Sequence, residues 1–130
     1  MEIMELSELI YPHMREELIA ELRGLSDREY QERVWVREEK VDGVVHDEFD
    51  YAIHFIFDDT SLASDAASCI GWFLLDEREA DSIQELVQTL NSLFEIYGLD
   101  LADSEYMAVP HWERVIGAAK NTMVLLMEKK

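Results

Sequence analysis

The sequence has few basic residues, one cysteine and no long apolar run. Its 130 residues include 11 Lys and Arg against 29 Asp and Glu, which gives a net charge of −18 at pH 7. Proteins bind nucleic acid and anionic membrane surfaces chiefly by neutralising phosphates with Lys and Arg. We therefore expect no direct binding to DNA, RNA or a membrane, and we expect a charged partner to be basic.

The other scarce features limit the class of protein. Cys69 is the single cysteine, so an internal disulfide and a multi-thiolate metal site are both excluded. No apolar stretch reaches the ~18 residues of a membrane-spanning helix, and the first residues are acidic where a secretory signal is basic. These absences predict a cytoplasmic protein. Because no linker rich in Pro or Gly interrupts the chain, we expect one acidic domain over residues 1–130.

The hydrophobic residues, 48% of the chain, are numerous enough for a packed core despite the charge. Their spacing mostly follows a helical period. Pro12 and Gly24 bracket one predicted helix, and Asp76 and Gly98 bracket the longest one. Pro110 begins a last helix whose final turns are apolar nearly all round, so we expect that end to be enclosed.

Three further segments complete the predicted fold. Ser26 and Glu29 have the spacing of a capping box, so a short helix should begin there. Residues 47–58 fit a helix or an alternating strand, and we favour the helix because a strand would turn Ile56 to its polar face. The apolar run 70–75 should be buried, as a short strand or a packed connector. The prediction is a mainly α fold, a bundle of about five helices with one short strand pair as an option.

The acidic surplus is uneven along the chain. Residues 1–50 hold 15 acids and six bases, residues 51–100 hold 10 acids and one base, and residues 101–130 hold four of each. Solvated helix faces account for many of these acids. A small domain needs only about 2 to 8 net charges for solubility, and a larger excess costs stability through repulsion. The excess therefore suggests a basic partner, bound cations or a salty cytoplasm.

Our main hypothesis is a non-enzymatic protein-binding domain whose acidic surface docks on a basic partner, because complementary charge speeds association. Trp35 is the expected aromatic anchor, since Trp is enriched at binding hot spots and residues 35–45 are predicted to form a loop with some extended pairing. The expected partner is a nuclease toxin or another nucleic-acid-binding protein, blocked by an immunity protein or nucleic-acid mimic. The predicted partner-binding residues are Asp58, Asp59, Asp76, Glu77, Glu79, Asp81 and Trp35.

The alternative hypothesis is a metal-dependent enzyme or metal sensor. His46, Asp50, His54 and Asp58 follow one another at intervals of four, so a helix over residues 46–58 would align them in one row. Imidazole and carboxylate at this spacing can share a divalent ion such as zinc. The main hypothesis requires no cofactor, and the sequence leaves the oligomeric state open.

Two other groups were considered for catalysis. The acids of residues 76–81 could form paired carboxylates, and Cys69 could act as a nucleophile with His54 or His111 as its base. A helix N-terminus attracts acids without any catalytic role, and no hydrolase signature surrounds the cysteine. We therefore expect neither group to carry a reaction.

The middle of the chain contains the motifs Phe57-Asp58-Asp59-Thr60, Leu62-Ala63, Ile70-Gly71, Leu75-Asp76-Glu77 and Glu79-Ala80. Together they resemble a pattern in small acidic bacterial proteins of uncharacterised function, over residues 49–98. The resemblance implies a bacterial origin and a helical fold, and it carries over no active site.

Overall fold

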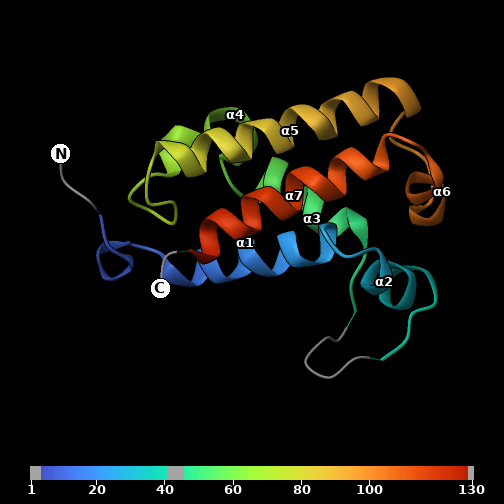
Figure 1. Cartoon of the computed structure of the whole chain (residues 1–130), viewed down its shortest axis with the longest axis horizontal. Coiled ribbons are helices and arrows are strands. Elements are labelled where there is room, and N and C mark those ends of the chain that lie inside the picture. Colours follow the sequence, from blue (N-terminus) through green and yellow to red (C-terminus); the bar gives the residue numbers. More distant parts are fainter. Residues whose placement is uncertain (1–3, 41–45, 129–130) are drawn as a thin grey trace.

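The structure is a computed structural model that describes residues 4–40 and 46–128. Within these ranges the chain forms seven α-helices joined by short 3-10 and π-helical turns (Figure 1). The same ranges contain no strand, only an isolated bridge between Ile70 and Leu74. The mainly α class is confirmed, whereas the count of about five helices was too low and the optional strand pair does not form there.

Three long helices make the body of the fold. The third of them, α7, contacts both α1 and α5, and the short helices cover the ends and the far side (Figure 1). None of the helices in the described part of the chain is both long and apolar enough to cross a membrane. The α-helices are α1 (Pro12–Leu25), α2 (Arg28–Tyr30), α3 (Phe49–His54), α4 (Leu62–Asp65), α5 (Glu77–Tyr97), α6 (Asp103–Ala108) and α7 (Trp112–Met127). The turns are η1 (Leu6–Glu8), η2 (Gln31–Val36), η3 (Phe55–Asp59) and η4 (Ala66–Cys69).

The longest helix, α5, begins and ends where its sequence predicts. The carboxylate of Asp76 accepts a hydrogen bond from the backbone N–H of Glu79 at 3.0 Å, which caps the first turn. Gly98 ends the helix with φ +83°, a conformation that residues with a Cβ rarely adopt. Between these ends the buried stripe is formed by Ile83, Leu86, Val87, Leu90 and Leu93.

The starts of the shorter helices differ from the prediction. The helix after α1 is capped by Asp27, whose carboxylate accepts from the N–H of Tyr30 at 3.1 Å, while the Ser26 hydroxyl donates to a carbonyl of α1. The segment 47–58 is helical as predicted, but α3 begins only at Phe49. The backbone N–H of Phe49 donates to the carboxylate of Asp103 in α6 at 3.1 Å, so α3 is capped from a distant part of the chain.

Trp112, the first residue of α7, lies at the centre of the core. Its indole N–H donates to the side-chain oxygen of Gln31 at 2.9 Å, and the Gln31 amide donates to two carbonyls at the end of α1 at 2.9 and 3.0 Å. Its ring meets Phe49 edge-on at 5.0 Å and Trp35 at 6.2 Å. The core thus joins α1, η2, α3 and α7 through one fully buried indole.

Three local predictions fail. The apolar run 70–75 is not buried throughout, because Trp72 is exposed. The last turns of α7 are not enclosed, because Val124 and Met127 are exposed. Residues 31–36 form the π-helical turn η2 rather than a loop from Trp35 onward. The predicted pairing around Asp42-Gly43 falls at residues 41–45, outside the residues that the structure describes.

Candidate functional site

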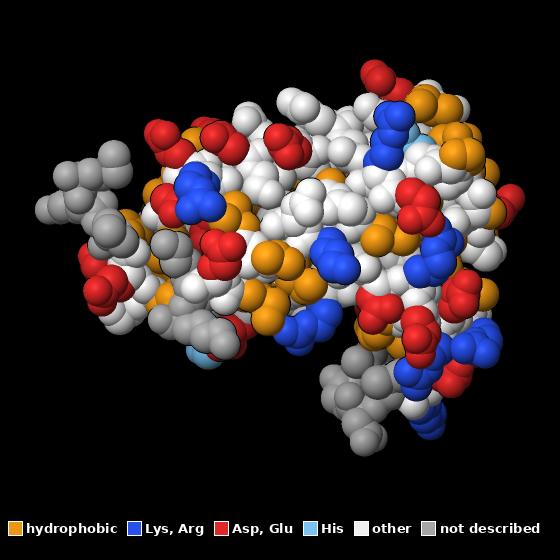
Figure 2. All heavy atoms as spheres, viewed as in Figure 1, with side chains coloured by type: hydrophobic (Ala, Val, Ile, Leu, Met, Phe, Trp, Pro, Cys, Tyr) orange, Lys and Arg blue, Asp and Glu red, His pale blue; other side chains and the backbone are white. Residues whose placement is uncertain are grey.

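Most of the negative charge lies on the elements from α3 to α6. Residues 46–113 contain 16 acids and one base, Arg78, hence a net charge of −15. The remaining residues contain 13 acids and 10 bases, hence −3. Figure 2 accordingly shows Lys and Arg among the acids on the face where α1 and α7 lie. The surplus is therefore concentrated in the part of the chain that runs from α3 to the first turn of α7.

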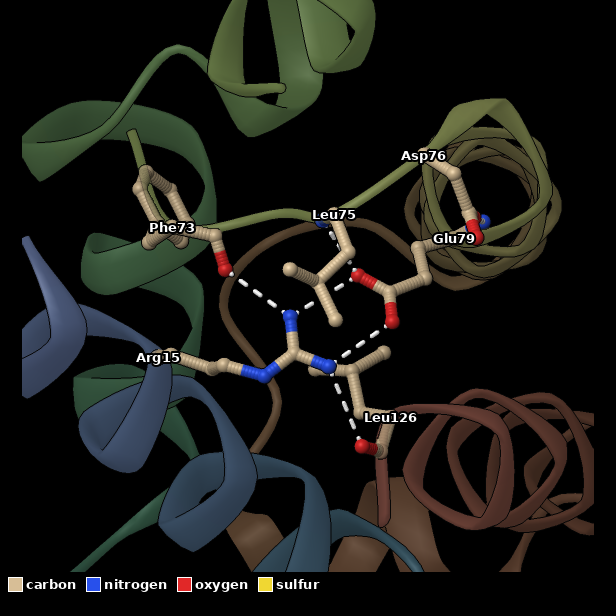
Figure 3. A network of polar contacts seen from close by, with 6 residues as sticks. All are labelled: Arg15, Phe73, Leu75, Asp76, Glu79 and Leu126. Atoms are coloured by element: carbon tan, nitrogen blue, oxygen red, sulfur yellow. Dashed lines mark hydrogen bonds and ion pairs between the residues drawn. The ribbon is translucent and has the colours of Figure 1, made fainter. Parts of the chain in front are cut away.

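Glu79 does not belong to this acidic surface, because it is buried in the core (Figure 3). Its two carboxylate oxygens accept from the guanidinium of Arg15 at 2.8 and 2.7 Å, and one of them also accepts from the Leu75 N–H at 2.7 Å. The guanidinium also donates to the carbonyls of Phe73 and Leu126, each at 3.0 Å. Both carboxylate oxygens of Glu79 accept hydrogen bonds inside the protein and neither is open to solvent, so the prediction that Glu79 contacts a partner was wrong.

The prediction that Trp35 is an exposed aromatic anchor was also wrong. It is 7% exposed, and its indole N–H donates to the carboxylate of Asp47 at 3.1 Å. The turn η2 directs the ring inward against Phe49 and Trp112. The exposed tryptophan is Trp72, with 45% of its surface open to solvent.

Trp72 forms part of an apolar surface. Its ring stacks on the ring of Tyr11, with centroids 5.3 Å apart and planes at 16°. Two backbone hydrogen bonds hold the segments together, from Tyr11 N–H to the Trp72 carbonyl at 2.7 Å and from Ile10 N–H to the Gly71 carbonyl at 3.1 Å. Ile10 and Tyr11 are exposed as well. We call Ile10, Tyr11 and Trp72 the aromatic surface.

An open cleft of about 380 Å³ lies beside the aromatic surface. It places Asp59, one of the predicted partner-binding acids, in the same hollow as Trp72. Cys69 also lines the cleft but is buried, and burial raises the pKa of its thiol, which disfavours the nucleophilic thiolate. The remaining lining residues are Tyr11, Met14, Thr60, Ser61, Ser68 and Phe73.

The other predicted acids divide into two groups. Asp58 is exposed next to Asp59 at the end of η3. The second group is at the start of α5, which follows Trp72 in the chain: Asp76 is partly buried by its capping role, while Glu77 and Asp81 are exposed. The structure thus keeps five of the six predicted acids at or near the surface.

The predicted metal-binding row is incomplete. His46 precedes α3, and its imidazole pairs with the Glu48 carboxylate at 3.0 Å instead of joining the row. His54 stands between the carboxylates of Asp58, at 2.6 Å from Nδ1, and Asp50, at 3.2 Å from Nε2. These three residues therefore form an ion triad on the surface of α3 and η3.

The two carboxylates of the triad favour the charged form of the imidazole. The hydrogen bond to Asp58 and the charge of Asp50 raise the pKa of His54. Over residues 4–40 and 46–128, no group of three or more His, Cys, Asp or Glu side chains is arranged to hold a metal ion. The geometry gives the alternative hypothesis no support.

A half-buried pair of acids was missed in the sequence. The carboxylate of Asp47 accepts hydrogen bonds from the Tyr30 hydroxyl at 2.7 Å and from the indole of Trp35. Burial, followed by the charges of Asp47 and Glu17, raises the pKa of Glu21 from 4.5 to about 7. No sequence signal separates Glu21 from the other acids of α1, because its burial and its proximity to Asp47 arise only when the chain folds.

Glu21→Gln is expected to stabilise the protein at high pH only. The folded-state pKa of Glu21, about 7, exceeds its unfolded value of 4.5, so its contribution to stability is full below pH 4.5 and is lost as the pH rises through about 7. Removing the charge should raise the free energy of unfolding by about 1–2 kcal/mol at pH 8, a value discounted for partial solvation, and by almost nothing at pH 4. Urea unfolding at the two pH values measures this, with the exposed Glu16→Gln as control. An equal effect at both pH values contradicts the prediction.

A protein-family model with the description "Domain of unknown function (DUF7945)" matches residues 9–130. The matched range includes all helices from α1 to α7 and the whole aromatic surface. No curated protein and no solved structure matches the chain.

Proposed function

Since the chain belongs to the family of domains of unknown function DUF7945, we propose from its surface that it is a non-enzymatic protein-binding domain that docks on a basic partner. The observation that carries the proposal is the exposed Tyr11–Trp72 stack, which shares a cleft with Asp59. Exposed aromatic residues at the centre of an apolar patch are typical binding hot spots. Residues 46–113, which include Asp59 and Trp72, carry a net charge of −15, which favours a cationic partner.

The two kinds of residue have separate roles in this function. The aromatic surface supplies contact area. Backbone hydrogen bonds hold the segments of its stacked rings together, so little conformational entropy is lost on binding. An arginine of the partner can stack on the face of Trp72 and reach the Asp59 carboxylate in the same cleft. The acids at the start of α5 steer the encounter. The revised docking residues are Tyr11, Trp72, Asp58, Asp59, Asp76, Glu77 and Asp81.

The partner class that we propose is a nucleic-acid-binding protein, such as a nuclease. The carboxylates of this domain would occupy the positions that phosphates take on the partner's surface. Such a protein already has a surface that binds closely spaced negative charges. The domain would then compete with nucleic acid for that surface. Adding DNA or RNA should release the partner from the immobilised domain, and a partner that binds both together excludes the mimic.

Trp72→Ala is expected to weaken partner binding about tenfold to a hundredfold, since truncating an aromatic hot spot costs roughly 2 kcal/mol or more. Asp59→Asn should have a smaller effect on affinity and reduce its dependence on salt. Partners are captured on the immobilised full chain at low salt, identified, and titrated against each variant. Val36→Ser is the matched control, because Val36 is an exposed apolar residue of η2 that does not line the cleft.

Three results would overturn the proposal. The first is that no basic protein is retained at low salt. The second is an affinity that does not fall as salt is added, because screening weakens attraction between exposed charges. The third is a Trp72→Ala variant that binds as well as Val36→Ser.

A further inference from the structure

A second hollow lies at the opposite end of α5, between α3 and α6. Its volume is about 280 Å³, close to the lower limit for ligand sites and suited to a single side chain. Its apolar lining includes Phe49, Ile53, Phe94, Leu101 and Tyr106. This groove shares no lining residue with the cleft at Trp72, and the two ends of the 21-residue helix α5 are about 30 Å apart.

Four carboxylates from two walls surround the apolar lining. Glu48 and Asp50 come from the start of α3, and Asp100 and Asp103 come from the connection to α6 and its first residue. In the ion pairs formed within residues 4–40 and 46–128, no Lys or Arg meets any of the four, while Glu48 contacts the imidazole of His46 and Asp50 that of His54. The groove thus combines a hydrophobic interior with negative charge that the rest of the described chain leaves without a Lys or Arg counterion.

Asp103 experiences this charge most directly. Its carboxylate is held in place by the N–H of Phe49 at 3.1 Å. Burial, together with the charges of Glu48, Asp50 and Asp47, raises its pKa despite that hydrogen bond. A cation in the groove would relieve the repulsion among these carboxylates.

We propose that this groove binds a lysine side chain from a segment of the basic partner, an inference that rests on the proposed function. The alkyl stem lies along the apolar lining, beside the rings of Phe94 and Tyr106, and the ammonium group meets the carboxylates of both walls. Lysine fits better than arginine, because an ammonium is compact and directs three donors to acceptors on both walls, while a guanidinium is broader and holds its donors in one plane.

The edge of the groove provides a further apolar contact for the partner. Leu99, which lines the opening, is 74% exposed, and Ile96 one turn earlier is 64% exposed. A second copy of the same chain is a poor occupant, because two molecules of charge −18 repel each other. Charge complementarity therefore selects a basic segment with an apolar residue near its lysine.

The test is an NMR titration of the full chain with octalysine at low salt. The resonances of Leu99, Leu101 and Tyr106 should shift on binding. Asp100→Asn should weaken the affinity about threefold, and the double variant Glu48→Gln/Asp100→Asn about tenfold, as expected for partly exposed ion pairs. Leu99→Ser should also weaken binding, since it removes an apolar contact but no charge. Asp103 is left unchanged because it caps α3.

The control is Glu85→Gln, which removes an exposed charge from the middle of α5. It should change the affinity less than twofold, a limit set by long-range charge alone. If octalysine shifts only the resonances around Trp72, or if Glu85→Gln acts as strongly as Asp100→Asn, the groove proposal is overturned and the proposed function stands. If octalysine binds nowhere at low salt, both are overturned.

Discussion

Glu79→Gln is expected to lower the free energy of unfolding by about 3–5 kcal/mol, because it leaves the guanidinium of Arg15 buried without a counter-charge. Both side chains are almost completely shielded from water, so no solvent can replace the lost partner. The substitution also disturbs the acceptor for the Leu75 N–H, and with it the segment that leads into α5. Urea or thermal unfolding of the variant measures the loss.

The exposed Glu77→Gln is the matched control, two residues earlier in the same helix, and should change stability by less than about 0.5 kcal/mol. The double variant Arg15→Met/Glu79→Leu should recover part of the loss, since a buried ion pair replaced by apolar groups often costs little. Recovery stays incomplete because the Phe73 and Leu126 carbonyls lose their donor. A loss below about 1 kcal/mol for Glu79→Gln would show that the ion pair does not hold these helices together.

Trp112→Ala is expected to cost about 3–5 kcal/mol, the usual effect of removing a large buried aromatic side chain. The indole touches Phe49 and Trp35 and fills the space where four elements meet. The variant also leaves the side-chain oxygen of Gln31 without its donor. Chemical denaturation followed by circular dichroism gives the change in stability.

Two controls separate volume from hydrogen bonding at this position. Trp112→Phe keeps most of the ring but loses the N–H, so it should cost about 1–3 kcal/mol, the penalty of an unsatisfied buried acceptor. Trp72→Ala removes the same side chain from a half-exposed position and should cost much less than Trp112→Ala. Equal losses for the two alanine variants would contradict the assignment of Trp112 to the centre of the core.

Features that depend on neighbouring residues were predictable from the sequence. The ends of α5 follow from a capping Asp76 and a Gly98 with positive φ, both of which act within one turn. The choice of helix for residues 47–58 also held, because the apolar spacing fits a helical face. The family match agrees with the resemblance to proteins of uncharacterised function.

Features that depend on distant residues were not predictable. Glu79 has the spacing of an N-terminal capping acid, and its burial is decided by Arg15, 64 positions away. The exposures of Trp35 and Trp72 are the reverse of those predicted, for a related reason. Trp35 stands among charged residues but turns inward to Asp47, and Trp72 stands in an apolar run but turns outward to stack on Tyr11. The residues next to each tryptophan in the sequence do not predict such contacts.

The helix α5 has a consequence for any partner that engages both of its ends. Its buried stripe packs along α7, so the separation of about 30 Å between its two ends, one next to Trp72 and the other next to Asp100, is fixed. A partner whose two contact segments match this spacing gains avidity, because the second contact forms at high effective concentration once the first is made. A partner with closer segments holds one end at a time. Under the proposed function, the length of α5 would therefore select basic partners by the spacing of their contact segments as well as by their charge.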